Sequence, residues 1–262
     1  MELNQLTKQY FQNLEETIKH ENSSCFEGFL HKAQTLFPYS VRNVGLILIQ
    51  SPNATQVHGI DDWKKRGASV KFGAKSIQIY APTKTKEGQE FCITNVVDIS
   101  DTSAKYFAPQ KIQTNELLLL INTVVHEFGY KLAYTNAFKP TYKKITYLDW
   151  TNRIIYLREG ANILLQAWMS LKDLILVYQQ EQIKKGKRAI QGQEYANAIA
   201  LASAFEVLDY FGINPPLIPS KAKELIMLDK NEKFVDKLKD IHKLASDIIR
   251  KIEALRGKNK KK

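Results

Sequence analysis

The segment from Tyr39 to Pro82 constrains the fold of this chain more than any other part of the sequence. It joins an apolar helical run, Leu46 to Gln50, to the turn Trp63-Lys64-Lys65-Arg66-Gly67, and then to an alternating run that ends at Pro82. An apolar helix, a basic turn and a strand in this order predict an α+β unit.

The turn opens a window without acidic residues. From Trp63 to Lys86 there are seven Lys or Arg and no Asp or Glu. Proteins hold single strands with cations that follow the backbone and with rings on which bases stack. Two alternatives are a solvated basic face and a Trp63 that packs a short helix onto the sheet. The candidate DNA-binding residues are Tyr39, Asn43, Trp63, Lys64, Lys65, Arg66, Lys71, Lys75, Lys84 and Lys86.

The order of residue types resembles the N-terminal domain of antirestriction proteins of the ArdC type, also called LtrC-like proteins. A second block, Phe91 to Thr102, is similar to the family's Val-Phe-Asp-x-Ser-Gln-Thr strand, with Val97 and Asp101 where Phe and Gln are usual. The residues that match in the first block are Tyr39-Ser40, Asn43, Leu46 to Gln50, Pro52, Ala54-Thr55, Val57, Trp63-Lys64, Gly67, Val70-Lys71, Gly73, Ile77, Ile79 and Pro82.

This resemblance extends over nearly the whole chain and implies a function. The N-terminal domain of the ArdC family is associated with binding of single-stranded DNA that does not depend on the base sequence. The expected function is therefore a non-enzymatic, antirestriction or conjugation-associated DNA-binding protein of a mobile genetic element such as a plasmid or phage. The expected partners are single-stranded DNA and a protein of the restriction or conjugation machinery.

Charge and composition bound the organisation. The 262 residues carry a net charge of +11, and residues 217–262 alone contribute 14 basic and 7 acidic residues, or +7. We expect an α+β N-terminal domain over 1–105, a mostly helical zincin-like domain with a small sheet over 113–216, and a C-terminal helix with a Lys-rich tail over 217–262. Two cysteines without a metal-binding spacing and no membrane-length apolar run predict a soluble, cytoplasmic protein.

His126-Glu127 imitates the start of a zinc-binding HExxH helix. The second histidine should stand four residues after the first, but Tyr130 stands there, and Gly129 ends the helix before it. The sequence therefore predicts no metal site at His126.

The family resemblance places the zincin helix elsewhere. The segment from Leu171 to Tyr178 aligns with it, and Asp173, Leu174 and Val177 stand at the positions of the first His, the catalytic Glu and the second His. The third ligand should lie within Ala200 to Ala204, which holds no carboxylate, and Glu206 falls outside that window. The resemblance thus implies a degenerate domain with no catalytic residue, no metal and no cofactor; an active zinc metallopeptidase is the third hypothesis.

The second hypothesis is a protein-interaction or scaffold role for this degenerate domain and the C-terminal helix. The helix carries one apolar stripe, which serves either a partner or its own domain. The stripe residues are Phe234, Leu238, Ile241, Ala245, Ile248, Ile252 and Leu255.

Periodicity predicts the elements that carry these sites. The Thr83 to Glu90 segment reads as a polar loop between two strands. Helices are expected over 3–20, 24–37, 40–50, a short stretch from Trp63, 116–128, 162–183, 193–211 and 232–255, and strands over 76–81, 91–99, 130–135, 145–148 and 154–157.

Overall fold

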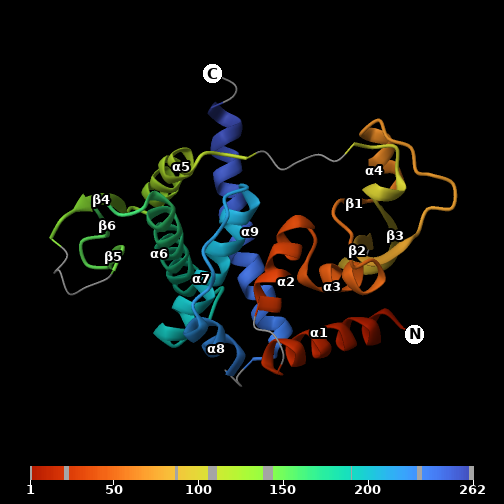
Figure 1. Cartoon of the computed structure of the whole chain (residues 1–262), viewed down its shortest axis with the longest axis horizontal. Coiled ribbons are helices and arrows are strands. Elements are labelled where there is room, and N and C mark those ends of the chain that lie inside the picture. Colours follow the sequence, from red (N-terminus) through yellow and green to blue (C-terminus); the bar gives the residue numbers. More distant parts are fainter. Residues whose placement is uncertain are drawn as a thin grey trace. The chain divides into compact units, whose positions relative to one another are not determined.

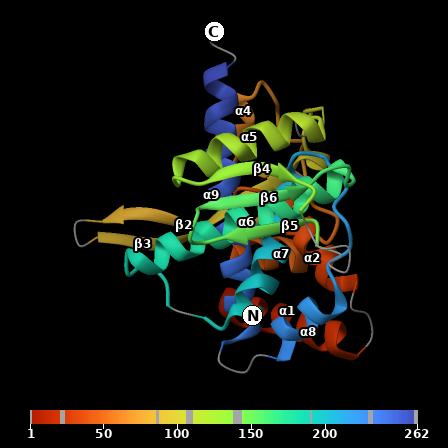
Figure 2. The same ribbon diagram turned by 90° about the vertical axis from the view of Figure 1, so that its left-hand side faces the viewer.

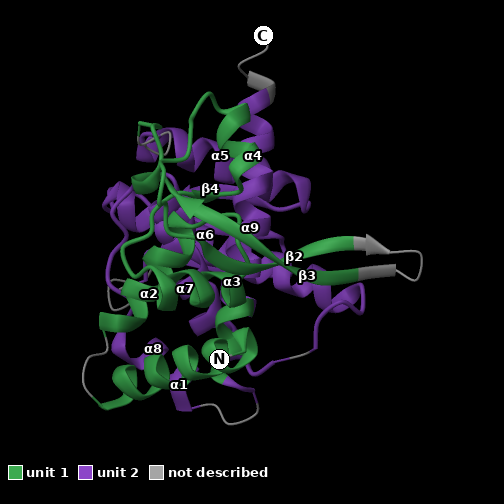
Figure 3. Cartoon of the chain, turned by 90° about the vertical axis from the view of Figure 1, so that its right-hand side faces the viewer, with its two compact units in different colours: residues 1–108, 234–239 green, residues 109–233, 240–262 purple. Residues whose placement is uncertain are grey.

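The computed structural model describes residues 2–20, 24–85, 88–105, 111–137, 144–189, 191–228 and 232–259. The chain forms two compact units, coloured separately in Figure 3: unit 1 holds residues 1–108 and 234–239, and unit 2 holds residues 109–233 and 240–262. Each unit combines helices with a three-stranded sheet, which confirms the expected α+β class. The C-terminal segment, predicted as a part of its own, is shared between the two units.

Unit 1 begins with the helices α1 (Leu3–His20), α2 (Ser24–Thr35) and α3 (Val41–Gln50) (Figure 1). Ser40 begins α3, because its side chain accepts a hydrogen bond from the Asn43 backbone N–H. α1 and α3 approach closely at Gly45, where an added Cβ would lie 2.8 Å from the Phe11 ring. A residue larger than glycine at this crossing would push the two helices apart.

The sheet of unit 1 is antiparallel, with the order β1-β3-β2 for β1 (Val57–His58), β2 (Ile77–Thr85) and β3 (Gly88–Asp98). The predicted loop over 83–90 is wrong for most of its length, since the pairing runs on from Thr83 opposite Glu90 to Thr85 opposite Gly88. Backbone groups alone make the ladder, so a polar pair of strands can continue without apolar side chains.

Two amide side chains of α3 cover the free edge of β2. Asn43 Nδ2 donates to the Tyr80 carbonyl at 2.8 Å, and the Tyr80 N–H donates to Asn43 Oδ1 at 3.0 Å. Gln50 repeats this pair with Gln78, at 2.9 Å to its carbonyl and 3.0 Å from its N–H. These bonds satisfy backbone groups that an edge strand otherwise leaves unpaired. We call the four bonds the amide clamp.

Unit 2 holds a small mixed sheet and the longest helices. Its strands are β4 (Lys131–Thr135), β5 (Thr146–Asp149) and β6 (Ile154–Arg158) in the order β4-β6-β5. β5 and β6 form the antiparallel hairpin that the sequence predicts, and β4 pairs with β6 in parallel. The helices are α5 (Thr114–Glu127), α6 (Ile163–Lys184), α7 (Gln193–Tyr210) and α8 (Ser220–Leu228), together with α9 (Phe234–Asn259) from Asp240 onwards.

α6 covers one face of this sheet. Ile155 and Leu157 on β6 are fully buried, and Thr146 on β5 donates a hydrogen bond from Oγ1 to Asp173 on α6. Figure 2 shows the three strands in front of α6 and α7. The opposite face of the sheet is therefore the one turned away from α6.

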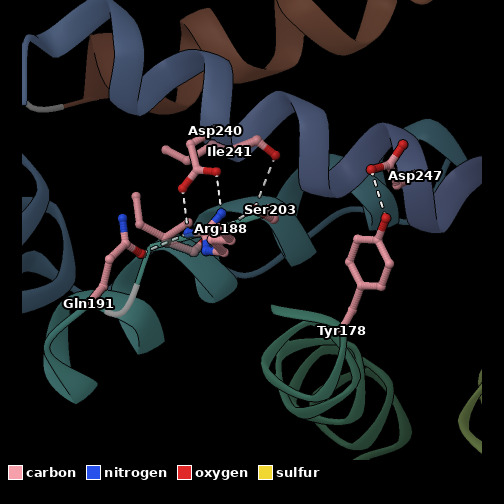
Figure 4. A network of polar contacts seen from close by, with 8 residues as sticks. Tyr178, Arg188, Gln191, Ser203, Asp240, Ile241 and Asp247 are labelled. Atoms are coloured by element: carbon pink, nitrogen blue, oxygen red, sulfur yellow. Dashed lines mark hydrogen bonds and ion pairs between the residues drawn. The ribbon is translucent and has the colours of Figure 1, made fainter. Parts of the chain in front are cut away.

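Polar contacts fix α9 within unit 2 (Figure 4). Asp240 forms a bidentate ion pair with Arg188, Asp247 accepts a hydrogen bond from the Tyr178 hydroxyl at 2.9 Å, and the Ile241 carbonyl accepts one from Ser203 at 3.1 Å. The stripe residues Ile241, Ala245, Ile248 and Ile252 are fully buried. The stripe thus packs in the interior of the chain, which is the second of the two alternatives that the sequence leaves open.

Within the residue ranges given above, no helix combines the length and the apolar character needed to cross a membrane.

Asn43→Ala should destabilise the chain by about 1–3 kcal/mol, because the backbone N–H and C=O of Tyr80 then lose the hydrogen bonds that the Asn43 amide gives them. Chemical denaturation followed by circular dichroism measures this loss. Asn53→Ala, on an exposed turn, is the matched control and should change the free energy of unfolding by less than about 0.5 kcal/mol. Equal stability of the two variants would show that the amide clamp is not a stabilising feature.

Candidate nucleic-acid interface

Trp63 lies in the interior and anchors the short helix α4 (Ile60–Lys65). None of its surface is exposed, and its indole N–H donates to the Val97 carbonyl at 3.0 Å. Its ring packs in a cluster with Ala68, Val97 and Ile99. His58 meets it edge-on at 4.8 Å between ring centroids.

The predicted role of Trp63 as a ring that stacks on a base is therefore wrong. A ring without exposed surface cannot receive a base, and its single donor already has a partner. Trp63 takes the alternative role of packing a short helix onto the sheet. Its burial carries a large apolar side chain out of water and fixes the basic residues that follow it.

Those basic residues are at the surface. Lys64, Lys65 and Arg66 are all exposed. Lys64 lies 3.8 Å from Asp61 and Lys65 lies 3.5 Å from Asp62, in ion pairs that are largely solvated. Exposed pairs of this kind contribute at most about 1 kcal/mol, so both ammonium groups can exchange a carboxylate for another anion.

Lys71 and Lys75 shape a second turn. The Lys71 ammonium donates to the Ser100 carbonyl at 2.7 Å, and the Lys75 ammonium donates to the Gln50 carbonyl. The backbone N–H of Lys75 also donates to Asp101 Oδ2 at 3.0 Å. Both lysines remain exposed, yet part of their hydrogen-bonding capacity holds the turn in place.

The tip of this second turn presents Phe72. Its relative exposure is 109%, higher than that of any other large apolar side chain in the described ranges. Gly73 follows it in the left-handed region with φ of 76°. The turn is held at Val70 and Ala74, which pack against the Trp63 cluster, so Phe72 points away from the core.

Sequence reasoning misses Phe72, because Trp63 beside three basic residues looks like the better stacking ring. The signal that could find it is the tetrad Lys71-Phe72-Gly73-Ala74, in which a tight turn leaves an aromatic ring no route to the interior. Since both turns flank the same Trp63 cluster, they form one region. We call Lys64, Lys65, Arg66, Lys71, Phe72 and Lys75 the basic turn surface.

The other candidates have structural roles or lie outside the described part. Asn43 is buried in the amide clamp. The Tyr39 hydroxyl donates to the Val57 carbonyl at 2.8 Å, and burial, aided by Asp62, raises the pKa of Tyr39 to about 12. Lys84 belongs to β2, but its side chain is not among those described, and Lys86 lies outside the described residues. Tyr39 is half-buried with its hydroxyl engaged, and both amide atoms of Asn43 are engaged, so these two side chains have structural roles.

The positions that align with a zinc helix are occupied by core and internally paired groups. Leu174 and Val177 are buried. Asp173 accepts a hydrogen bond from Thr146 at 2.5 Å and forms an ion pair with Lys172. Both of its oxygens are thus engaged within the protein.

The third-ligand region is equally unsuited. Ala200, Ala202 and Ala204 are buried, and Glu206, one turn on, pairs with His242 at 2.8 Å. Burial raises the pKa of Glu206, and His242 opposes that shift only in part. Within the described ranges no three His, Cys, Asp or Glu side chains form a group that could hold a metal. The donors at the aligned positions do not fit a metal ion.

Comparison with known proteins bears on the N-terminal part most directly. Residues 3–106 match the family model for the N-terminal domain of anti-restriction factor ArdC. No curated protein sequence matches the chain. The resemblance seen in the motifs from Tyr39 to Thr102 is thereby confirmed.

Solved structures extend the similarity. The metal-free crystal structure of the antirestriction ArdC protein from the R388 plasmid is 11% identical, with a TM-score of 0.50, and the match covers 95% of this chain and 98% of that one. The Mn(II)-bound crystal structure of that protein is also 11% identical, with a TM-score of 0.48 and coverage of 88% and 96%. At 11% identity, the similarity to the metal-free structure shows that the two proteins share a fold.

Trp63→Phe should lower the free energy of unfolding by about 1–3 kcal/mol, because the Val97 carbonyl loses its donor. The folded variant should bind single-stranded oligonucleotides with unchanged affinity. Trp150→Phe, at a half-exposed tryptophan of unit 2, is the control for the loss of an indole. A weaker affinity without a loss of stability would instead place Trp63 in contact with DNA.

Proposed function

We propose that this chain is an antirestriction protein that binds single-stranded DNA through the basic turn surface, because residues 3–106 match the family model for the N-terminal domain of ArdC. The observation that carries the proposal is Phe72. It is a fully exposed ring between two lysines, in a window with seven basic and no acidic residues. Cations and an open ring in one region are the two components that single-strand binding needs.

The two components have separate tasks. Lys64, Lys65 and Arg66 would neutralise phosphates, which accounts for affinity and for its dependence on salt. Phe72 would stack on an unpaired base, which a duplex does not offer because its bases are already stacked. Neither contact reads a base edge, so binding would be independent of sequence.

An antirestriction role follows from such binding. The R388 plasmid protein with the shared fold bears the name antirestriction protein. A strand that enters a cell during conjugation or phage infection is unpaired, and a protein that covers it would protect it until it is replicated. The chain would act by occupancy, without a chemical step.

Unit 2 would contribute no catalysis. Leu174 and Val177 offer no metal ligand, and Asp173 is committed to Lys172 and Thr146. We regard this unit as a pseudo-metallopeptidase whose helices are kept for packing. The competing hypothesis of a protein partner rests on the α9 stripe, and the burial of the stripe side chains disfavours that use.

Phe72→Ala should weaken binding of a single-stranded oligonucleotide by at least about fivefold, since one base stack is worth about 1–3 kcal/mol. Phe91→Ala, another exposed aromatic of unit 1, is the control and should have no effect. Fluorescence anisotropy in a salt series gives both affinities. An equal loss of affinity in the two variants would show that Phe72 has no specific role in DNA binding.

Lys64→Glu with Lys65→Glu should lower the affinity for single and double strands alike and reduce the slope of log K against log salt by about 1–2, because phosphate contacts release counterions. Lys8→Glu with Lys19→Glu, at two exposed positions of α1, changes the net charge by the same amount and is the control. An unchanged slope would show that these lysines do not touch phosphates.

Protein purified from zinc- and manganese-supplemented medium should carry no bound metal ion above trace level by plasma mass spectrometry, because the aligned positions lack a donor set. The Asp173→Ala variant should give the same metal content as the parent chain. Stoichiometric zinc or manganese in the parent chain, absent from Asp173→Ala, would instead support the hypothesis of an active metallopeptidase.

A further inference from the structure

The richest mixture of aromatic and basic residues in this chain lies in unit 2, outside the basic turn surface. From Lys131 to Gly160 the sequence has six Lys or Arg, two acidic residues and six aromatic residues. The window from Trp63 to Lys86 has seven basic residues but only three aromatic ones. Among the described aromatic residues of this segment, three are more than 40% exposed: Tyr134 at 55%, Tyr147 at 50% and Trp150 at 44%.

Two tyrosines form a stacked pair on the sheet of unit 2. Tyr147 on β5 stands directly opposite Tyr156 on β6, and their rings lie 6.4 Å apart between centroids with an interplanar angle of 19°. Side chains alternate along a strand. Thr146 bonds to α6, and Ile155 and Leu157 are buried beneath the sheet. The tyrosine pair therefore lies on the face that is turned away from α6, which Figure 2 shows toward the viewer.

Cations flank this pair on the same face. Lys131 pairs in register with Ile154, and Thr135 pairs with Arg158; both positions share a face with Tyr156 by alternation along β6. Lys131 is exposed and Arg158 is half-buried. The face therefore presents two parallel rings between positive charges from β4 and the end of β6.

The two acidic residues of this segment, Asp149 at the end of β5 and Glu159 just after β6, accept hydrogen bonds from other groups. Asp149 accepts hydrogen bonds from the backbone N–H groups of Thr151 and Asn152, at 3.0 and 2.9 Å, which lowers its pKa. Glu159 accepts a hydrogen bond from Asn136 at 2.6 Å. Both carboxylates are thus engaged by the turns at the ends of the sheet, and Asp149 shares the outer face with Tyr147 by alternation along β5.

We propose that the outer face of β4-β6-β5 is a second binding surface for single-stranded DNA. Unpaired bases stack on Tyr147 and Tyr156, while Lys131 and Arg158 contact the phosphates on either side. An open sheet with neighbouring aromatic rings accepts successive bases of a single strand, whereas a duplex presents only its backbone to such a surface. This surface is separate from the basic turn surface, so it stands or falls independently of the proposed function of unit 1.

The test uses the full chain with Tyr147→Leu and Tyr156→Leu together. Leucine keeps an apolar cross-strand pair but removes the rings, and Tyr134→Leu, at an exposed tyrosine on the alternate face, is the matched control. The probe is a fluorescein-labelled oligo(dT) of about 12 nucleotides, within the usual site size. We expect the double variant to lose at least about fivefold in affinity, and the control to bind as the parent chain does.

Photocross-linking locates the contact directly. A 5-bromodeoxyuridine oligonucleotide should cross-link to Tyr147 or Tyr156, identified by mass spectrometry, and should still do so in the Phe72→Ala, Lys64→Glu, Lys65→Glu variant. Loss of all cross-links in that variant would overturn the second surface, and so would unchanged affinity in a folded Tyr147→Leu, Tyr156→Leu chain. Binding of a duplex of the same length as tightly as the single strand would also contradict it.

Discussion

The amide clamp between α3 and β2 is the interaction on which the arrangement of unit 1 depends. Asn43 and Gln50 replace a missing neighbouring strand, each giving one donor and one acceptor to the edge of β2. The clamp closes the edge against pairing with another chain and fixes the helix on the sheet. The basic turn surface comes directly before β2 in the chain. The contact between α3 and β2 therefore also helps to fix the position of that surface.

A second constraint acts in both units, where buried polar groups find their partners inside the chain. In unit 1 Asp98 is 5% exposed, and its carboxylate accepts hydrogen bonds from the backbone of Thr55, Gln56 and Ser100. In unit 2 Asp173 is held by Thr146 and Lys172. A buried carboxylate is stable only when it is paired. In unit 2 this pairing engages both oxygens of Asp173 within the protein.

The elements were largely predictable, whereas the site was predictable only in outline. Helical spacing of apolar residues located the long helices, and the Asp149 to Asn152 turn located the β5-β6 hairpin. Lys64, Lys65 and Arg66 are exposed as predicted. Trp63 and Asn43 are not at the surface, because the indole packs in the core and the amide forms hydrogen bonds in the amide clamp. Phe72 and the Tyr147–Tyr156 pair escaped prediction, since neither exposure nor cross-strand register can be read from neighbours in the sequence.

The sequence by itself determined the residue order that matches the ArdC N-terminal domain over residues 3–106, the acid-free window and the residue types in the aligned helix. These depend on residue type and spacing, which the chain carries before it folds. Only the tertiary structure decided which aromatic rings face water. A Trp beside three cations can turn into a core or away from it, and the free energy of burying its large apolar surface against Val97 and Ile99 settles that choice.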